Sequence, residues 1–382
     1  MKVFVAFGTR PEAIKCFPVI DALKAEPGVS VVACTTAQHR HILDQVLESV
    51  GLQPDIDLNL MREKPSLTDI TVDVMNRMGE VLAAERPDRV IVQGDTTTAM
   101  ATALAAFYQG IKVGHVEAGL RTNNILSPWP EEANRKIIST LADMHFAPTD
   151  LARDNLLREN VDPATVHVTG NTVIDALHAV RRRLKEKSYQ VKTQEPRLKE
   201  YLDGDKRLIL MTAHRRENWG EGIASICDAA LSLVARGDTF IVFPVHPNPR
   251  VRDMVRDVLG DNPDIFLLEP LAYADFVLML DRAAVVLTDS GGVQEEAPAL
   301  GKPVLIMRDT TERPEGVSAG CAKLVGLDTA EIVAQTNKLL DDPVAYKSMS
   351  QVQNPYGDGT AAKQIVDIIL GRKQHVVAGG NT

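Results

Sequence analysis

The chain has 382 residues, of which 45% are hydrophobic and 24% are charged, and its formal net charge is −9. This length predicts two domains, and the composition is typical of a globular protein without a membrane span. The negative charge argues against a general nucleic-acid-binding or anionic-membrane surface. Basic residues that bind an anionic ligand would therefore have to be gathered locally.

Cysteine usage and apolar run lengths both indicate the cytoplasm. Cys16, Cys34, Cys227 and Cys321 are scattered, with no Cys-x-x-Cys pair. This favours free buried thiols in a reducing compartment over disulfides or a zinc site. The starting run MKVFVAFGTRPE is too short for a signal peptide and predicts a first strand. No apolar run approaches the roughly twenty residues of a membrane span.

In the first half of the chain, short apolar runs alternate with amphipathic segments. The expected strands are 2–7, 29–36, 88–95, 111–117, 144–149 and 166–171, and the expected helices include 14–26, 41–51, 67–85 and 98–110. Strands that alternate with helices through short connections form a parallel sheet covered on both faces. We therefore predict an α/β domain over residues 1–171.

A helix over 172–187 and the polar stretch 188–206 follow, and we expect the linker helix and domain boundary at 172–205. The alternation then restarts, with strands at 207–214, 239–246, 264–270, 283–289, 302–308 and 321–326. This predicts a second α/β domain over 206–360, and a C-terminal helix and tail over 361–382. Ligands of open α/β sheets bind beyond the carboxyl ends of the strands. We expect the active site there, in the cleft between the domains.

Polar residues follow the expected strands of the first domain. Arg10 and Lys15 lie in GTRPEAIK after the first strand, where both supply positive charge or are simply solvated. Asp95 follows a later strand and is a candidate acid or a cap of the next helix. Glu117 ends a buried strand beside glycines, which capping explains less well.

Two further motifs add charged candidates. PEEANRK places Glu131 at an expected helix start, with Arg135 four residues later. An ordinary i,i+4 salt bridge on a surface helix is the alternative explanation for this spacing. His214 follows the first strand of the second domain.

The stretch LTDSGGVQEEAPALGKPVLIMRDTTERPEG, residues 287–316, combines an apolar strand, a glycine turn and a short expected helix, 293–301. Ser290, Gly291 and Gly292 bring backbone N–H groups to a helix N-terminus, which binds anions. Glu296 lies about one helical turn further on and is a candidate acceptor for a sugar diol. Arg313 offers forked donors to phosphate. A charged surface loop is the alternative for a Ser-Gly-Gly turn taken alone.

Nine motifs, in order from residue 8 to residue 359, resemble the non-hydrolysing UDP-N-acetylglucosamine 2-epimerases. They are GTRPEAIK, AQHR, QGDTTT, HVEAGLRT, PEEANRK, HRREN, TDSGGVQEEAPALGKPVL, RDTTERPEG and NPYGDG. The resemblance implies two Rossmann-like domains of the GT-B type, a homodimer, and neither a metal nor a nicotinamide cofactor. It also makes residues 287–316 a UDP-binding signature.

The resemblance also implies roles for single residues. The catalytic acids would be Asp95, Glu117 and Glu131, supported by Arg135 and His214. The contacts to UDP would come from Arg10, Lys15, His214, Phe276, Ser290, Gly291, Gly292, Glu296 and Arg313. Phe276 would lie against the uracil, and Leu271, polar in some relatives, would offer only a backbone contact. Gln38 resembles part of a second, activating UDP-GlcNAc site, and His41 stands where some relatives have glutamine.

The expected reaction explains these residue types. The C2 hydrogen of a sugar nucleotide is not acidic until the C1–O bond weakens. Cationic groups stabilise the departing UDP, and carboxylates stabilise C1 and remove the C2 proton. The resulting 2-acetamidoglucal takes UDP back with C2 protonated from the other face. Which carboxylate is acid and which is base stays open.

We therefore predict interconversion of UDP-GlcNAc and UDP-ManNAc for surface polysaccharide synthesis. The nearest alternative is a 2-epimerase of a related UDP-diacetamido sugar uronate. A GT-B glycosyltransferase and a catalytically silent UDP-sugar sensor are alternatives from other classes. An oxidative route would need a nicotinamide fingerprint, and the Gly-Glu-Gly at 220–222 lacks the third glycine.

Overall fold

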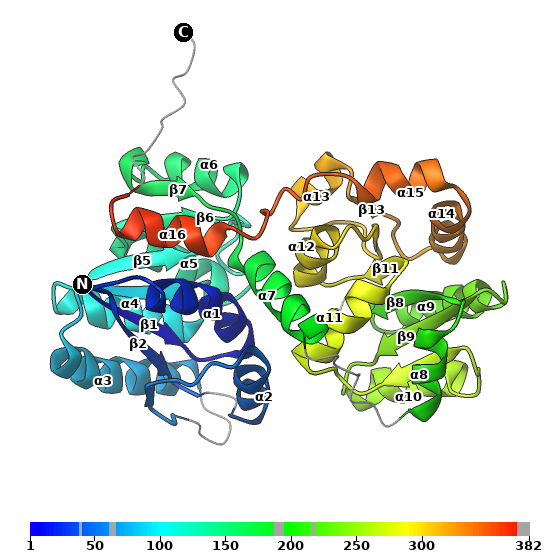
Figure 1. The fold of residues 1–382 in the computed structure, drawn as a ribbon, viewed down its shortest axis with the longest axis horizontal. Coiled ribbons are helices and arrows are strands. Elements are labelled where there is room, and N and C mark those ends of the chain that lie inside the picture. The colour runs from blue at the N-terminus through cyan, green and yellow to red at the C-terminus, as the bar shows by residue number, and fades with distance from the viewer. Residues whose placement is uncertain (38–39, 61–65, 187–194, 216–217, 373–382) are drawn as a thin grey trace, which may run out of the picture. The chain divides into compact units, whose positions relative to one another are not determined.

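The computed structural model describes residues 1–37, 40–60, 66–186, 195–215 and 218–372. It divides into two compact units. Unit 1 is Met1–His178 with the segment from Gly357 onward, and unit 2 is Ala179–Tyr356. The chain leaves unit 1 within α7 (Thr172–Glu186) and returns between Tyr356 and Gly357. The C-terminal helix α16, red in Figure 1, therefore lies among elements from the start of the chain.

Unit 1 is built on a parallel sheet of order β3-β2-β1-β4-β5-β6-β7. The direction of strand succession reverses between β1 and β4, and such a reversal marks the usual ligand site of an open α/β sheet. The strands are β1 (Lys2–Phe7), β2 (Ser30–Thr35), β3 (Ile56–Asp57), β4 (Arg89–Gln93), β5 (Lys112–Val116), β6 (Met144–Ala147) and β7 (Val166–Val168).

The helices of unit 1 cover this sheet. α4 packs against α3 and α5, and α1 packs against α2 and α16. Alanines such as Ala99, Ala103 and Ala106 are buried in α4, so the backbones approach closely. The helices are α1 (Arg10–Lys24), α2 (Arg40–Val50), α3 (Leu67–Glu85), α4 (Thr97–Tyr108), α5 (Glu131–Leu141), α6 (Asp150–Arg158), the first part of α7, and α16 (Ala361–Ile369).

Unit 2 repeats this plan with the strand order β10-β9-β8-β11-β12-β13, again fully parallel. The reversal here lies between β8 and β11. The strands are β8 (Arg207–Thr212), β9 (Thr239–Pro244), β10 (Ile265–Leu268), β11 (Val285–Thr288), β12 (Val304–Ile306) and β13 (Ala322–Leu324).

The helices of unit 2 enclose a core of aliphatic and aromatic side chains. α9 packs against α10 and α14, over strand residues such as Ile209, Phe243 and Leu287. The helices are α8 (Pro196–Asp203), α9 (Glu221–Val234), α10 (Pro249–Leu259), α11 (Tyr273–Arg282), α12 (Gly291–Ala299), α13 (Pro314–Ala319), α14 (Thr329–Asp341) and α15 (Pro343–Ser350). Across the described residues of both units, none of the helices is long and apolar enough to cross a membrane.

The structure adds elements to those predicted and starts some predicted helices earlier. The short strand β3 and the helix α8 are additional, and α8 lies in the polar stretch predicted as boundary. The stretch folds because Leu198 is buried and the ring of Tyr201 packs edge-on against Phe266, with 4.9 Å between ring centroids. Two predicted helices begin earlier than expected: α1 begins at Arg10 rather than at residue 14, and α12 begins at Gly291 rather than at residue 293.

Candidate active site

The carboxyl ends of β1 and β4 lie side by side in unit 1, and the turn after β1 is held closely. A Cβ atom at Gly8 would lie 2.3 Å from Thr36 Oγ1 and 2.7 Å from Thr98 Oγ1. Only glycine therefore fits where the chain passes between these hydroxyls. α1 begins two residues later at Arg10, whose side chain is half-buried at the strand ends.

Glu12 joins the turn after β1 to the turn after β4, a role that the sequence analysis did not assign. Its carboxylate is 1% exposed and accepts from Gly8 N at 3.1 Å, Thr9 N at 2.8 Å and Thr96 Oγ1 at 2.6 Å. Burial raises the pKa of Glu12, although the hydrogen bonds from Thr96 and Thr9 oppose that rise. The spacing Thr9-x-x-Glu12 is a capping-box signal that was available in the sequence.

Glu117 directly follows β5 and receives hydrogen bonds from three separate parts of the chain. Lys15 Nζ lies 2.6 Å from Glu117 Oε1 and 2.7 Å from Oε2, and Asn171 Nδ2 lies 2.9 Å from Oε1. Gln93 Nε2 also donates to Oε2. Glu117 is 8% exposed and its φ is 63°, in the left-handed region that a glutamate rarely adopts. Such backbone persists where the surroundings determine it strongly, as at active sites.

Asp95 pairs with Arg135. Arg135 Nε lies 2.8 Å and its NH2 2.7 Å from Asp95 Oδ2, and its NH1 lies 3.0 Å from Glu132 Oε2. The capping alternative for Asp95 is wrong, because Thr96 is the N-cap residue of α4 and its Oγ1 accepts from Ala99 N at 3.0 Å. The structure thus brings together Asp95 and Arg135, which are 40 residues apart.

The neighbours Glu131 and Glu132 at the start of α5 have different environments. Glu132 is fully buried and accepts from Thr122 N at 3.1 Å and Asn123 N at 3.2 Å, besides Arg135. Glu131 Oε2 is also buried, but no hydrogen-bond partner for it exists among the described residues. The i,i+4 alternative is therefore wrong, because the pair within α5 joins Arg135 to Glu132. A buried carboxylate oxygen without a partner requires an explanation, and catalysis is one.

Two buried histidines lie on the adjacent strands β5 and β6. His115 Nε2 lies 2.7 Å from the carbonyl oxygen of Gly94, and His115 pairs in register with His145 of β6. Burial lowers the pKa of both histidines to about 4. Both rings are therefore neutral at pH 7, and His115 supports the Gly94 turn that carries Asp95.

In unit 2, Asp289 follows β11 and holds the turn after β8. It is fully buried and accepts from His214 N at 2.9 Å, Arg215 N at 2.9 Å and Asn218 Nδ2 at 3.0 Å. His214 Nδ1 lies 3.0 Å from Asp289 Oδ1. Burial raises the pKa of Asp289, but the hydrogen bonds and charge of His214 outweigh it and hold the pKa below its usual value. The ring of His214 is 42% exposed, and its Nε2 points away from this carboxylate.

The Ser-Gly-Gly turn starts α12 next to the turn that holds His214. Ser290 is the N-cap residue, and Gly291 and Gly292 form the first turn, near the surface. The first N–H groups of a helix lack intrahelical partners and attract anions. Glu296 is one turn further on, with Oε1 2.8 Å from the hydroxyl of Tyr273 and Oε2 4.0 Å from where a Cβ of Gly292 would lie. The predicted acceptor thus lies about one turn along α12 from the predicted anion site.

Arg313 stands before α13 and is held by a buried carboxylate. Its Nε donates to Oε1 of Glu295, whose side chain is 2% exposed. Tyr356 OH lies 3.2 Å from the carbonyl oxygen of Arg313 and accepts from Gly316 N at 2.9 Å. Neither anchor was predicted from the sequence. The NPYGDG motif supplies Tyr356, so this motif supports the loop that carries Arg313.

The remaining predicted residues are placed as follows. Phe276 lies in α11, and Leu271 lies just before α11; both are half-buried. His41 lies in α2, where its side chain is not described, and Gln38 is outside the described residues.

Comparison with known proteins identifies the family. Residues 21–370 match the family model described as UDP-N-acetylglucosamine 2-epimerase. The chain belongs to this family. UDP-N-acetylglucosamine 2-epimerase of Escherichia coli strain K12 is 50% identical over 370 residues, which cover 97% of this chain and 98% of that protein. The family predicted from the nine motifs is therefore confirmed.

Solved epimerase structures share the whole architecture. The Neisseria meningitidis UDP-GlcNAc 2-epimerase bound to UDP-GlcNAc has a TM-score of 0.86 and 47% identity, and covers 97% of this chain and 100% of its own. The Methanocaldococcus jannaschii UDP-GlcNAc 2-epimerase in complex with UDP-GlcNAc and UDP has a TM-score of 0.78 and 33% identity, with the same coverage. The prediction of an α/β chain with two Rossmann-like sheets of the GT-B type is confirmed.

Proposed function

We propose that this protein interconverts UDP-GlcNAc and UDP-ManNAc by inverting C2. The proposal is supported by membership of the epimerase family over nearly the whole chain. The observation that supports it most directly is the arrangement of the carboxylates Asp95, Glu117 and Glu131 in unit 1. Glu117 and Asp95 are each bound to a cation, whereas the buried Oε2 of Glu131 has no hydrogen-bond partner among the described residues. These three carboxylates would thus supply both the stabilisation of positive charge on the sugar and the transfer of its proton.

The residues of unit 2 would hold the nucleotide. His214 Nε2, the amides of Gly291 and Gly292 and the guanidinium of Arg313 would bind the diphosphate. Glu296 would accept from the ribose, and Phe276 would lie against the uracil. Because Arg313 pairs with Glu295, the net positive charge at this position is limited. UDP would then be held without being bound too tightly to add back to C1. Arg10 and Lys15 of unit 1 would add positive charge.

The proposed reaction has two balanced steps. The C1–O bond breaks with its electron pair going to the β-phosphate, and a carboxylate removes the C2 proton, which leaves 2-acetamidoglucal and UDP. Glu131 is the proposed proton carrier, because its oxygen is buried and unpartnered. Glu117 and Asp95 would stabilise positive charge at C1. In the return step, a second carboxyl group of this set would protonate C2 on the opposite face, and the phosphate oxygen adds again to C1.

A single assay tests this function against its alternatives. The protein is incubated with UDP-GlcNAc alone, and UDP-ManNAc is sought by chromatography and proton NMR. We expect both sugars at equilibrium. A glycosyltransferase needs an acceptor, an epimerase of a diacetamido uronate needs another sugar, and a sensor has no turnover. An unchanged substrate would therefore contradict the proposal.

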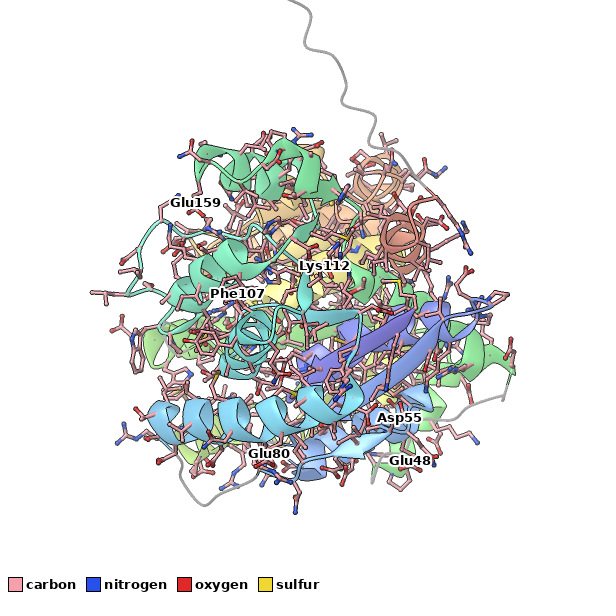
Figure 2. The ribbon with its side chains drawn as sticks, turned by 90° about the vertical axis from the view of Figure 1, so that its left-hand side faces the viewer. Glu48, Asp55, Glu80, Phe107, Lys112 and Glu159 are labelled. Atoms are coloured by element: carbon pink, nitrogen blue, oxygen red, sulfur yellow. The ribbon has the colours of Figure 1, made fainter. Side chains whose placement is uncertain are left out.

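We also propose a second copy of the chain as a partner. α3, α4 and α5 expose apolar side chains, and Val72, Phe107, Tyr108 and Ile137 are 50%, 55%, 71% and 41% exposed. In Figure 2, α3 crosses the view of unit 1, and Phe107 of α4 is labelled. Light scattering should give the mass of a dimer, and a Phe107→Ser/Tyr108→Ser variant should shift it toward that of one chain.

Location and regulation complete the proposal. Cytoplasmic action is supported by four buried free cysteines, a set that suits a reducing compartment. Cell fractionation tests this, and loss of surface polysaccharide on gene deletion tests the pathway. A second UDP-GlcNAc at Gln38 and His41 would make the reverse reaction, from UDP-ManNAc, depend on added UDP-GlcNAc.

A further inference from the structure

Asn171 stands directly before α7 and uses both ends of its side-chain amide. Its Oδ1 accepts from Val173 N at 3.1 Å, and its backbone carbonyl accepts from Ile174 N at 3.1 Å. Its Nδ2 donates to Glu117 Oε1 at 2.9 Å. The residue is 2% exposed. Because the oxygen caps the helix, the nitrogen is fixed in the direction of Glu117.

The donors to Glu117 differ in what they supply. Lys15 reaches both carboxylate oxygens and therefore supplies charge with little constraint on their direction. Asn171 approaches one oxygen and Gln93 the other. Two planar amides on separate oxygens fix the plane of the carboxylate, which a single ammonium group cannot do.

The segment that returns from unit 2 packs on the backbone of Asn171. Gly357 has a φ of 127°, and a Cβ there would lie 3.4 Å from Gly170 Cα and 3.5 Å from Asn171 N. Asn171 therefore lies between the start of α7, through which the chain leaves unit 1, and the segment through which it returns.

We propose that Asn171 is a positioning residue for the epimerisation, acting through its N–H donor to Glu117. This role rests on the proposed function and adds a residue to it. The cap alone would accept aspartate, serine or asparagine. The hydrogen bond to Glu117 requires a side chain that can donate, and an ionised aspartate cannot donate. Asn171 thus sets the orientation of Glu117 toward the reacting carbons, and its contact with the return segment ties that orientation to the two connections between the units.

The test is Asn171→Asp, which keeps the size and the helix cap but places an acceptor against Glu117. We expect kcat to fall by roughly thirtyfold or more, since small displacements of reacting groups cost up to about a hundredfold. KM should change by less than about threefold. The acidic limb of the pH–rate profile should move to higher pH, because one of two adjacent carboxylates is then protonated more readily. Asn171→Ser keeps the cap without reaching Glu117, so kcat should fall with little movement of the limb.

Asn248→Asp is the matched control. Asn248 caps α10 in the same way, with its Oδ1 3.0 Å from Arg250 N, and its side chain donates to no carboxylate among the described residues. We expect unchanged kcat and pH profile in this variant. UDP affinity by calorimetry should stay close to wild type in both Asn171 variants, whereas the melting temperature should fall in both, and further in Asn171→Asp, where two buried carboxyl groups adjoin.

The possible outcomes separate the role of Asn171 from the proposed function. A folded Asn171→Asp variant with the wild-type kcat and pH profile would overturn this role alone. If both Asn171 variants fail to fold, the residue is a structural cap and the proposal is wrong. A wild-type protein that does not interconvert the two sugars would overturn the proposed function, and this role with it.

Discussion

Lys15 Nζ lies 2.6 Å from Glu117 Oε1, although 102 residues separate them in the chain. Their side chains are 16% and 6% exposed, so the pair is largely shielded from solvent. Removing one partner from such a pair leaves an uncompensated charge, which typically costs about 3 kcal/mol or more. Lys15 therefore serves both the fold of unit 1 and the charge of the candidate site.

Lys15→Met should lower kcat by about a hundredfold, because Glu117 would lose the nearby positive charge that balances its buried carboxylate. The midpoint of urea unfolding should also fall. Steady-state kinetics and fluorescence-monitored unfolding measure the two effects. Lys24→Met on the same helix is the control, since Lys24 is exposed in the last turn of α1. Equal kinetics in the two variants would show that the ion pair has no part in turnover.

Arg313→Ala should weaken UDP binding by about 2 kcal/mol, the usual worth of a hydrogen bond to a charged group. This corresponds to roughly a thirtyfold higher Kd by calorimetry. Arg236→Ala is the matched control, because Arg236 also pairs with carboxylates of unit 2, Asp238 and Asp341, at the surface. Unchanged affinity in the Arg313 variant would remove that residue from the nucleotide site.

The sequence predicted the elements better than the contacts between them. The helix predicted at 67–85 has the observed bounds of α3, because its apolar spacing and the capping residue Ser66 are local signals. β3 has two residues, too few for a periodic signal. The polar residues that organise the site are a different matter, because their partners are distant in the chain. Thr96 and Glu12 are 84 residues apart, and no local pattern carries such a pairing.

The family resemblance predicted more of the site residues than local patterns did, but only residues that lie inside the nine motifs. It singled out Glu117 and Lys15, whose pairing was not itself predicted. Asn171 lies outside the nine motifs, and its one local signal is the preference for asparagine at a helix start. Its bond to Glu117 depends on the register of β5 beside β6 and β7, which only the folded sheet provides.

The buried histidines make stability depend on pH. The folded pKa of His145 is about 4, against an ordinary value of 6.5. Between these values the unfolded chain binds a proton that the folded chain does not, so stability falls as pH decreases from 6.5 toward 4 and is fully present above 6.5. The loss at pH 5 is about 2 kcal/mol from this residue.

His145→Leu should remove that loss, because leucine is close in volume and does not titrate. Urea unfolding of the variant and wild type at pH 7 and pH 5 measures the difference. The gap between the two pH values should be smaller in the variant by about 2 kcal/mol. An equal gap in both proteins would mean that His145 does not oppose acid unfolding.

Glu131→Gln and Glu132→Gln should separate catalysis from folding. Glu132 is fully buried and paired with Arg135, so its replacement should destabilise unit 1 by about 3 kcal/mol. Glu131 Oε2 has no partner among the described residues, so glutamine there breaks no hydrogen bond and should destabilise unit 1 much less than the Glu132 change. The Glu131 variant should nevertheless lose epimerisation while keeping UDP affinity. Full activity with the Glu131 variant would exclude it as the proton carrier.

Turnover in D₂O tests the elimination and readdition steps directly. If a carboxylate removes the C2 proton and exchanges it with solvent, the product should carry deuterium at C2 and hydrogen at C3 and C4, as NMR can resolve. Because the glycal forms before UDP returns, prolonged incubation should release some 2-acetamidoglucal together with free UDP. Added NAD should change neither result, since no step of the proposed reaction transfers a hydride. Product that keeps hydrogen at C2 throughout would require an internal hydride shift or a base shielded from solvent, and either would contradict the proposed mechanism even with the substrate assignment intact.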